Sequence, residues 1–146
     1  MHHPIYTSPA AARTGLQIHI DSARAAHSRY QCCEMEQREV IAAVQVALGA
    51  CEIAAILQLL PPEELHAWRR AACDPSAATP HEQAQSVLRA EGVSLTAASW
   101  EQLVELRERT RGVAEPARAL VGELAEQEIQ SRCWRQGLQT AGAASH

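Results

Sequence analysis

The amino-acid sequence predicts an all-α protein, a five- or six-helix bundle with one long or kinked helical hairpin at its N-terminal end. The strongest indication is the stretch 41–60, which is apolar on nearly every side and carries a single charge, Glu52. The composition agrees: 47% of residues are hydrophobic, whereas aromatics make up 3% and Phe is absent. This suits closely packed helices, because strands favour aromatic and β-branched side chains. Apart from residues 16–20, no segment alternates with a period of two.

A chain of 146 residues has the length of one domain and can bury a core of its own. We expect a single helical domain over residues 10–139, a flexible arm at 1–9 and a flexible tail of small residues at 140–146. The net charge of −4 is mild and does not indicate a general electrostatic attraction to nucleic acid. Lys, Asn and Phe are absent. Because their codons are AT-rich, this absence indicates a GC-rich bacterial or phage genome.

The first half of the chain is expected to form a helix over 14–33, followed by the apolar segment. The residues that share one face of this helix step by four and three: Leu16, Ile20, Ala23, His27 and Tyr30. No proline or glycine separates the helix from the apolar segment. One continuous helix to Leu60 and two helices with a joint near 31–36 both fit the sequence. We favour the joint, because a helix of that length would far exceed the usual range.

The second half of the chain contains clear start and stop signals. Pro61 and Pro62 end the apolar helix and begin the next one, and the following two glutamates complement its positive end. Residues 79–82 form a capping box with proline at the first helical position. The expected helices are 62–72, 80–92, one that starts from a cap at Ser94, Thr96 or Ser99 and ends near Gly112, and 116–136.

The apolar segment must be sheltered by the rest of the bundle, by a second copy of the chain or by lipid. Lipid is disfavoured, because Glu52 would lie near the middle of a bilayer. One face of the helix is a ladder of small residues: Ala43, Ala47, Ala50 and Ala54. The other face carries large aliphatic residues: Ile41, Val44, Leu48, Ile56 and Leu59.

Two apolar faces exceed what the short, charged helices after Pro61 can cover. We therefore expect self-association into a homodimer or higher oligomer, with the region 14–60 as the interface. The residues assigned to self-association or to the core are Ile41, Val44, Leu48 and Ile56. A monomeric five-helix bundle is the alternative.

The sequence carries no specific catalytic, nucleotide-binding or metal-binding signature, so we expect no enzyme and no cofactor. It has no glycine-rich phosphate loop, and no Cys–His pair lies in a strand–turn–helix context. A metal- or thiol-dependent helical protein is an alternative, because His19 and His27 share a face and Cys32 and Cys33 follow. The cysteine count is odd and no secretory leader is visible, so we expect reduced thiols in the cytoplasm.

Residues 80–111 have the outline of a helix-turn-helix, with 97–111 as the recognition helix. Three arginines on this helix are placed to touch phosphates: Arg107, Arg109 and Arg111. The same helix carries acids that phosphates would repel: Glu101, Glu105 and Glu108. A DNA-binding regulator is therefore an alternative function and not the favoured one.

The tryptophans divide by position. Trp68 and Trp100 lie at expected core positions, whereas Trp134 follows a polar helix and is a candidate anchor for a partner, together with Arg132 and Arg135. We therefore expect a non-enzymatic protein–protein interaction factor: an adaptor, chaperone-like factor, inhibitor or assembly subunit. Its partner is expected to be a protein of unknown identity, and neither nucleic acid nor a membrane.

Overall fold

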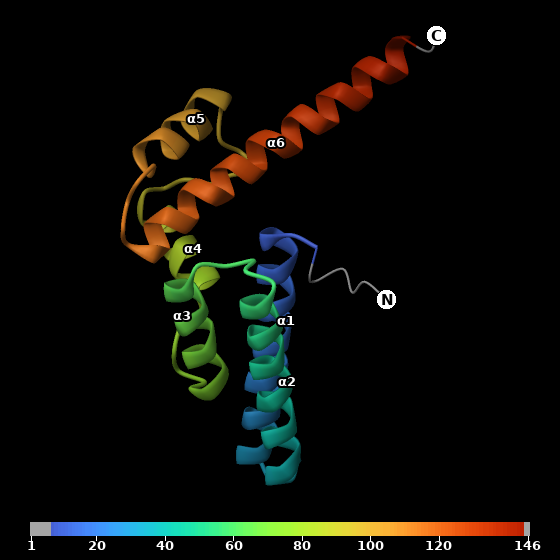
Figure 1. The fold of residues 1–146 in the computed structure, drawn as a ribbon, viewed down its shortest axis with the longest axis vertical. Helices are drawn as coiled ribbons and strands as arrows, with labels where there is room; N and C mark the ends of the chain where they lie inside the picture. The colour runs from blue at the N-terminus through green and yellow to red at the C-terminus, as the bar shows by residue number, and fades with distance from the viewer. Residues whose placement is uncertain (1–6, 145–146) are drawn as a thin grey trace. The chain divides into compact units, whose positions relative to one another are not determined.

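The structure is a computed structural model that describes residues 7–144, and over that range the chain forms six α-helices and no strands (Figure 1). The predicted all-α class is confirmed. The helices are α1 (Pro9–Gln31), α2 (Gln37–Ile56), α3 (Pro62–Cys73), α4 (Pro80–Ala90), α5 (Trp100–Arg109) and α6 (Pro116–Ala144). Their contacts fall into two compact units, Met1–His81 and Glu82–His146. The single domain expected over 10–139 stays a prediction.

In the first unit, α1 and α2 run antiparallel as a packed hairpin, and α3 lies against both (Figure 1). Helix α1 begins at Pro9, five residues before the predicted start, because Ser8 caps it. The backbone N–H of Ala11 donates to Ser8 Oγ at 3.1 Å, and proline is well suited to the first helical position. Residues 1–6 of the predicted arm lie outside the described part of the chain.

The predicted joint between α1 and α2 is confirmed, and a continuous helix to Leu60 is excluded. Cys33 has a φ of 60°, in the left-handed region, and the N–H of Glu34 donates to the carbonyl of Arg29 at 2.8 Å. This closes the end of α1 as a left-handed residue does at many helix ends. Helix α2 then starts with a capping box, in which the N–H of Glu36 donates to Glu39 Oε2 at 2.9 Å.

Helix α2 ends at Ile56, four residues before the predicted end. The cause is local: Gln58 has a φ of 53°, and the N–H of Leu59 donates to the carbonyl of Ala54 at 3.0 Å. The polypeptide therefore leaves the helix before it reaches the prolines. Pro61 occupies the position before the first residue of α3, and Pro62 begins that helix as predicted.

The core of the first unit is built around the small residues of α2. Its buried members are Ala47, Ala50, Cys51 and Ala54, which are at most 4% exposed. They form one cluster with large side chains from α1 and α3: Leu16, Ile20, Leu65 and Trp68. The short side chains of α2 allow the neighbouring helices to approach closely, and the long side chains of the neighbours fill the remaining space.

A buried ion pair ties α1 to α3 within this unit. Arg13 donates to both carboxylate oxygens of Glu64, from Nε to Oε2 at 2.9 Å and from Nη2 to Oε1 at 2.8 Å. Trp68 Nε1 donates to the same Oε2 at 2.9 Å. The two charged side chains are 3% and 7% exposed. Glu64, expected only to complement the positive helix end, therefore holds two helices together.

The segment after α3 is also attached to α1. Arg24 Nη2 donates to the carbonyl of Ala77 at 2.8 Å, and the hydroxyl of Thr79 donates to Gln17 Oε1 at 2.6 Å. Asp74, the residue directly after α3, accepts hydrogen bonds from the hydroxyl and the N–H of Ser76. These hydrogen bonds lower the pKa of the Asp74 carboxyl. Polar contacts thus fix the connection that leads out of the first unit.

In the second unit, α5 packs against the first half of α6, which continues beyond it (Figure 1). The core is aliphatic and contains Ala84, Leu88, Ala98, Leu103, Leu106, Leu120, Val121, Ala125 and Ile129. Gly92 and Gly112 have φ values of 69° and 74°, which confirms the predicted ends of the preceding helices. Ser99 accepts from the N–H of Gln102 at 3.2 Å, so it is the cap of α5 among the three predicted candidates.

Two expectations for the second unit are wrong. Helix α6 continues to Ala144, beyond its predicted end at Gln136. The flexible tail expected at 140–146 stays a prediction, and residues 145–146 of it lie outside the described part of the chain. Trp100, expected in the core, is 44% exposed, because the cap at Ser99 makes it the first residue of α5.

We expect Glu64→Ala to lower the free energy of unfolding by about 3–5 kcal/mol, because it removes one partner of a buried ion pair. The matched control is Glu63→Ala, the exposed neighbour in the same helical turn, with an expected change of about 0.5 kcal/mol or less. Urea unfolding followed by circular dichroism measures both. Equal losses in the two variants would contradict a buried role for the Glu64 carboxylate.

Candidate functional site

The side of α2 that faces away from its buried residues carries a continuous row of exposed residues. We call this row the α2 seam: Ala42, Val46, Gly49, Ile53 and Ile56. Successive members are separated by four, three, four and three residues, which is the spacing by which helices pair along a narrow apolar strip. The seam spans most of the length of α2, from its second turn to its last residue.

The large members of the seam are strongly exposed in the single chain. Ile56 is 74% exposed, Val46 55% and Ile53 37%. Ile41 and Leu57, which lie at the two margins of the row, are also exposed. Clusters of large aliphatic side chains on one helix face are typical of surfaces that bind a partner.

A polar margin runs along one side of the α2 seam and consists of Gln45 and Glu52. Arg69 Nη2 of α3 donates to Glu52 Oε1 at 3.1 Å, and the Glu52 side chain is 65% exposed. The only charge in the apolar stretch therefore lies at the surface, paired with an arginine of the same unit. It interrupts neither the buried face of α2 nor the seam.

The four residues predicted for self-association or core divide into two pairs. Ile41 and Ile56 are exposed, whereas Val44 and Leu48 are half-buried, and Leu48 packs against the core of the first unit. The assignment of these four residues to self-association or core stays a prediction. Sequence reasoning missed Val46 and Ile53, although the four-three spacing of the seam is visible in the sequence.

Within the described part of the chain, α2 is also the one helix long and apolar enough to cross a membrane, judged by length and composition. Only 22% of its most apolar window is buried. The central helix of a soluble core passes the same test of length and composition but is mostly buried. Most residues of this window are therefore only partly buried or exposed in the single chain.

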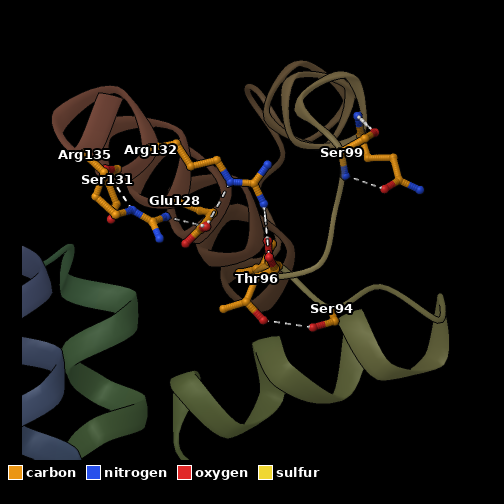
Figure 2. A network of polar contacts seen from close by, with 9 residues as sticks. Ser94, Thr96, Ser99, Glu128, Ser131, Arg132 and Arg135 are labelled. Atoms are coloured by element: carbon orange, nitrogen blue, oxygen red, sulfur yellow. Dashed lines mark hydrogen bonds and ion pairs between the residues drawn. The ribbon is translucent and has the colours of Figure 1, made fainter. Parts of the chain in front are cut away.

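The residues predicted to bind a partner lie on α6. Trp134 is 69% exposed. Arg132 donates to Glu128 Oε1 at 3.0 Å and to the carbonyl of Leu95 at 3.0 Å, and Arg135 donates to the same carboxylate oxygen at 3.4 Å (Figure 2). The guanidinium of Arg132 thus holds the loop before α5 against α6. A partner-binding role for these three residues stays a prediction.

The arginines assigned to phosphate contacts are engaged with carboxylates. Their pairs are Arg107 with Glu126 at 2.8 Å, Arg109 with Glu91 at 2.8 Å and Arg111 with Glu108 at 3.1 Å. Residues 91–99 separate α4 from α5, whereas the helix-turn-helix motif uses a turn of about three or four residues. These observations give the DNA-binding alternative no support.

A shallow depression of about 410 Å³ in the second unit is lined by residues of α6, of the connection before it and of the end of α5, including Glu123, Glu126, Thr110 and Arg107. The hydrogen bond from Arg107 lowers the pKa of the Glu126 carboxyl, which therefore stays ionised and acts as the partner of the guanidinium. A general acid or base near neutral pH needs a pKa shifted toward 7. Glu126 therefore does not meet this requirement for a general acid or base.

Among the described residues, no group of three or more His, Cys, Asp and Glu is arranged to hold a metal ion. Cys32, Cys33, Cys73 and Cys133 are exposed free thiols, and Cys51 is a buried one. Burial raises the pKa of the Cys51 thiol to about 11. His27 Nε2 lies 3.3 Å from the side-chain amide of Gln31, in a contact within one helix.

Comparison of the chain with protein-family models, with curated proteins and with solved structures finds no match.

The buried position of Cys51 on the inner face of α2 predicts slow reaction with thiol reagents. At pH 8 roughly one molecule in a thousand carries the thiolate, which is the reactive form. We expect four thiols to react rapidly with a chromogenic disulfide and the fifth only after the addition of denaturant. Cys51→Ala should remove the slow thiol alone. Five rapid thiols would contradict the packing of α2 against α1 and α3.

Proposed function

We propose that this chain is a non-enzymatic helical protein–protein interaction factor that acts through the α2 seam and associates with itself. The observation that carries the proposal is the exposure of Val46, Ile53 and Ile56 in a row on one helix face. Such a factor serves as an adaptor, chaperone-like protein, inhibitor or assembly subunit, and its site of action is the cytoplasm.

The energetic argument concerns the burial of these side chains. Moving a Val or Ile side chain from water into an apolar interface contributes roughly 1.5–3 kcal/mol when burial is complete. In the seam, Val46, Ile53 and Ile56 are 55%, 37% and 74% exposed, and only these fractions remain to be buried. Counted on both copies of a symmetric dimer, this burial contributes about 5–10 kcal/mol. Association costs about 4–15 kcal/mol in lost freedom, so flanking contacts have to contribute as well.

The form of the seam favours a helix of a partner protein over lipid. The seam is a narrow strip bordered by Gln45 and Glu52, and Glu52 is ion-paired with Arg69. The opposite face of α2 is covered by α1 and α3. A helix laid along a strip with four-three spacing buries every member of the strip and leaves the polar margin in water.

We expect Ile56→Gln to raise the dissociation constant for self-association by about tenfold or more, because a buried isoleucine contributes more than the 1.4 kcal/mol that corresponds to a factor of ten. Sedimentation velocity over a concentration series from the low micromolar range measures this. The matched control is Ile18→Gln on α1, an isoleucine that is 58% exposed and lies outside the seam. It should leave the dissociation constant unchanged.

A wild-type chain that remains monomeric throughout the series would contradict self-association. Equal weakening by the two substitutions would show that general surface hydrophobicity, and not the α2 seam, drives the association.

A further inference from the structure

We propose that the partner of the α2 seam is a second copy of this chain, whose α2 lies antiparallel to the first about a two-fold axis at Gly49. This inference rests on the proposed function and adds the direction of the pairing and its register. Three features of the seam lead to it: the position of Gly49, the sizes of the residues on either side of it, and the placement of the polar margin.

Gly49 lies in the interior of α2, where glycine is about 1 kcal/mol less favourable than alanine. The packing of its own chain does not require it, because a Cβ added there would meet no atom within 4 Å. Its φ does not lie in the left-handed region, so the backbone does not require it either. A glycine in such a place allows the backbone of another helix to approach closely.

The seam carries a small residue, Ala42, near its start and a large one, Ile56, at its end. Of the two directions of pairing, the antiparallel one places the small residue opposite the large one. With the two-fold axis at Gly49, a residue before Gly49 in one copy lies at the same height as the residue equally far after Gly49 in the other copy. This follows because each residue advances the helix by about 1.5 Å. Ala42 then lies level with Ile56 of the other copy, and a large side chain fills the space left by a small one. Val46 of one copy and Ile53 of the other copy are offset along the helix by the rise of one residue.

A parallel pair in register lacks this complementarity. It brings Ala42 level with Ala42 and Ile56 level with Ile56, which leaves space at the start of the helix and crowds its end. Voids and overpacking both destabilise an apolar interface. The seam is therefore complementary to itself in one direction only.

The polar margin agrees with the antiparallel direction. Gln45 and Glu52 lie on the same side of the seam, four residues before and three residues after Gly49. In the antiparallel pair this side of one α2 meets the same side of the other. Gln45 of each copy lies within the rise of one residue of Glu52 of the other copy. The Gln45 amide can donate a hydrogen bond, and the Glu52 carboxylate can accept it. Neither polar group has to enter the apolar row.

Disulfide trapping tests the direction of the pair in the full-length chain. The background carries serine at the four exposed cysteines, Cys32, Cys33, Cys73 and Cys133, and keeps the buried Cys51. Ala42→Cys and Ile56→Cys are made separately in this background, oxidised alone and oxidised after mixing. A disulfide forms only when the two Cβ atoms come within about 4.5 Å. We expect a covalent dimer from the mixture and little from either variant alone.

Gly49→Ala tests the position of the axis by a readout that the trapping does not use. The substitution should raise the melting temperature of the monomer, because alanine is the better helix former, and should raise the dissociation constant by about tenfold, because the added methyl groups meet at the axis. The control is Gly137→Ala in α6, where an added Cβ also meets nothing within 4 Å. It should leave the dissociation constant unchanged.

The contrary outcomes are distinct. Covalent dimers from each variant alone, with none specific to the mixture, would overturn the antiparallel pair and leave self-association through the seam in place. A monomeric wild-type chain would overturn both the pair and the self-association in the proposed function. Flotation of the wild-type chain with phosphatidylcholine vesicles, abolished by Ile56→Gln, would identify lipid as the cover of the seam and overturn the second copy.

Discussion

The first unit depends on an unequal distribution of side-chain size around α2. Its short side chains, Ala47, Ala50 and Ala54, face α1 and α3, so those helices approach closely and supply the bulk of the core from Leu16, Ile20 and Trp68. The same arrangement leaves Val46, Ile53 and Ile56 of α2 exposed on the opposite side. Good packing within the chain and an uncovered apolar row are therefore two results of one sequence pattern, and the fold and the proposed interaction have a common origin.

The polar contacts of the first unit complement this packing. A carboxylate that accepts three hydrogen bonds from two side chains ties α1 to α3 in the core, while Gln17 and Arg24 hold the segment that follows α3. The bidentate geometry of this ion pair restricts the relative position of the two helices, because both guanidinium contacts have to be satisfied together. The face of α2 opposite to these helices is thereby kept in a defined orientation.

Most of the fold was predictable, because its signals are local. Pro62, Pro80 and Pro116 begin helices, Gly92 and Gly112 follow helix ends, and the joint between α1 and α2 was expected from length alone. The end of α2 could not be predicted, because it depends on the left-handed conformation of Gln58, and glutamine is not a residue type that indicates this conformation. On α2, three members of the expected ladder of small residues, Ala47, Ala50 and Ala54, are buried. Nearly every residue of this helix is apolar, so periodicity could not tell which side the other helices would cover. The contacts of Glu64 with Arg13 and of Arg132 with the carbonyl of Leu95 were not predicted, because these partners lie far apart in the sequence and no local pattern reveals them.

The corner between α1 and α2 has an evolutionary consequence. Its closure comes from main-chain hydrogen bonds around Cys33, a residue that adopts a backbone shape normally left to glycine. The two sulfhydryls at this corner are exposed free thiols. Exchange of either residue, most readily for glycine at the second position, should therefore leave the topology of the hairpin unaltered. Loss of these thiols along a lineage would say nothing against preservation of the architecture.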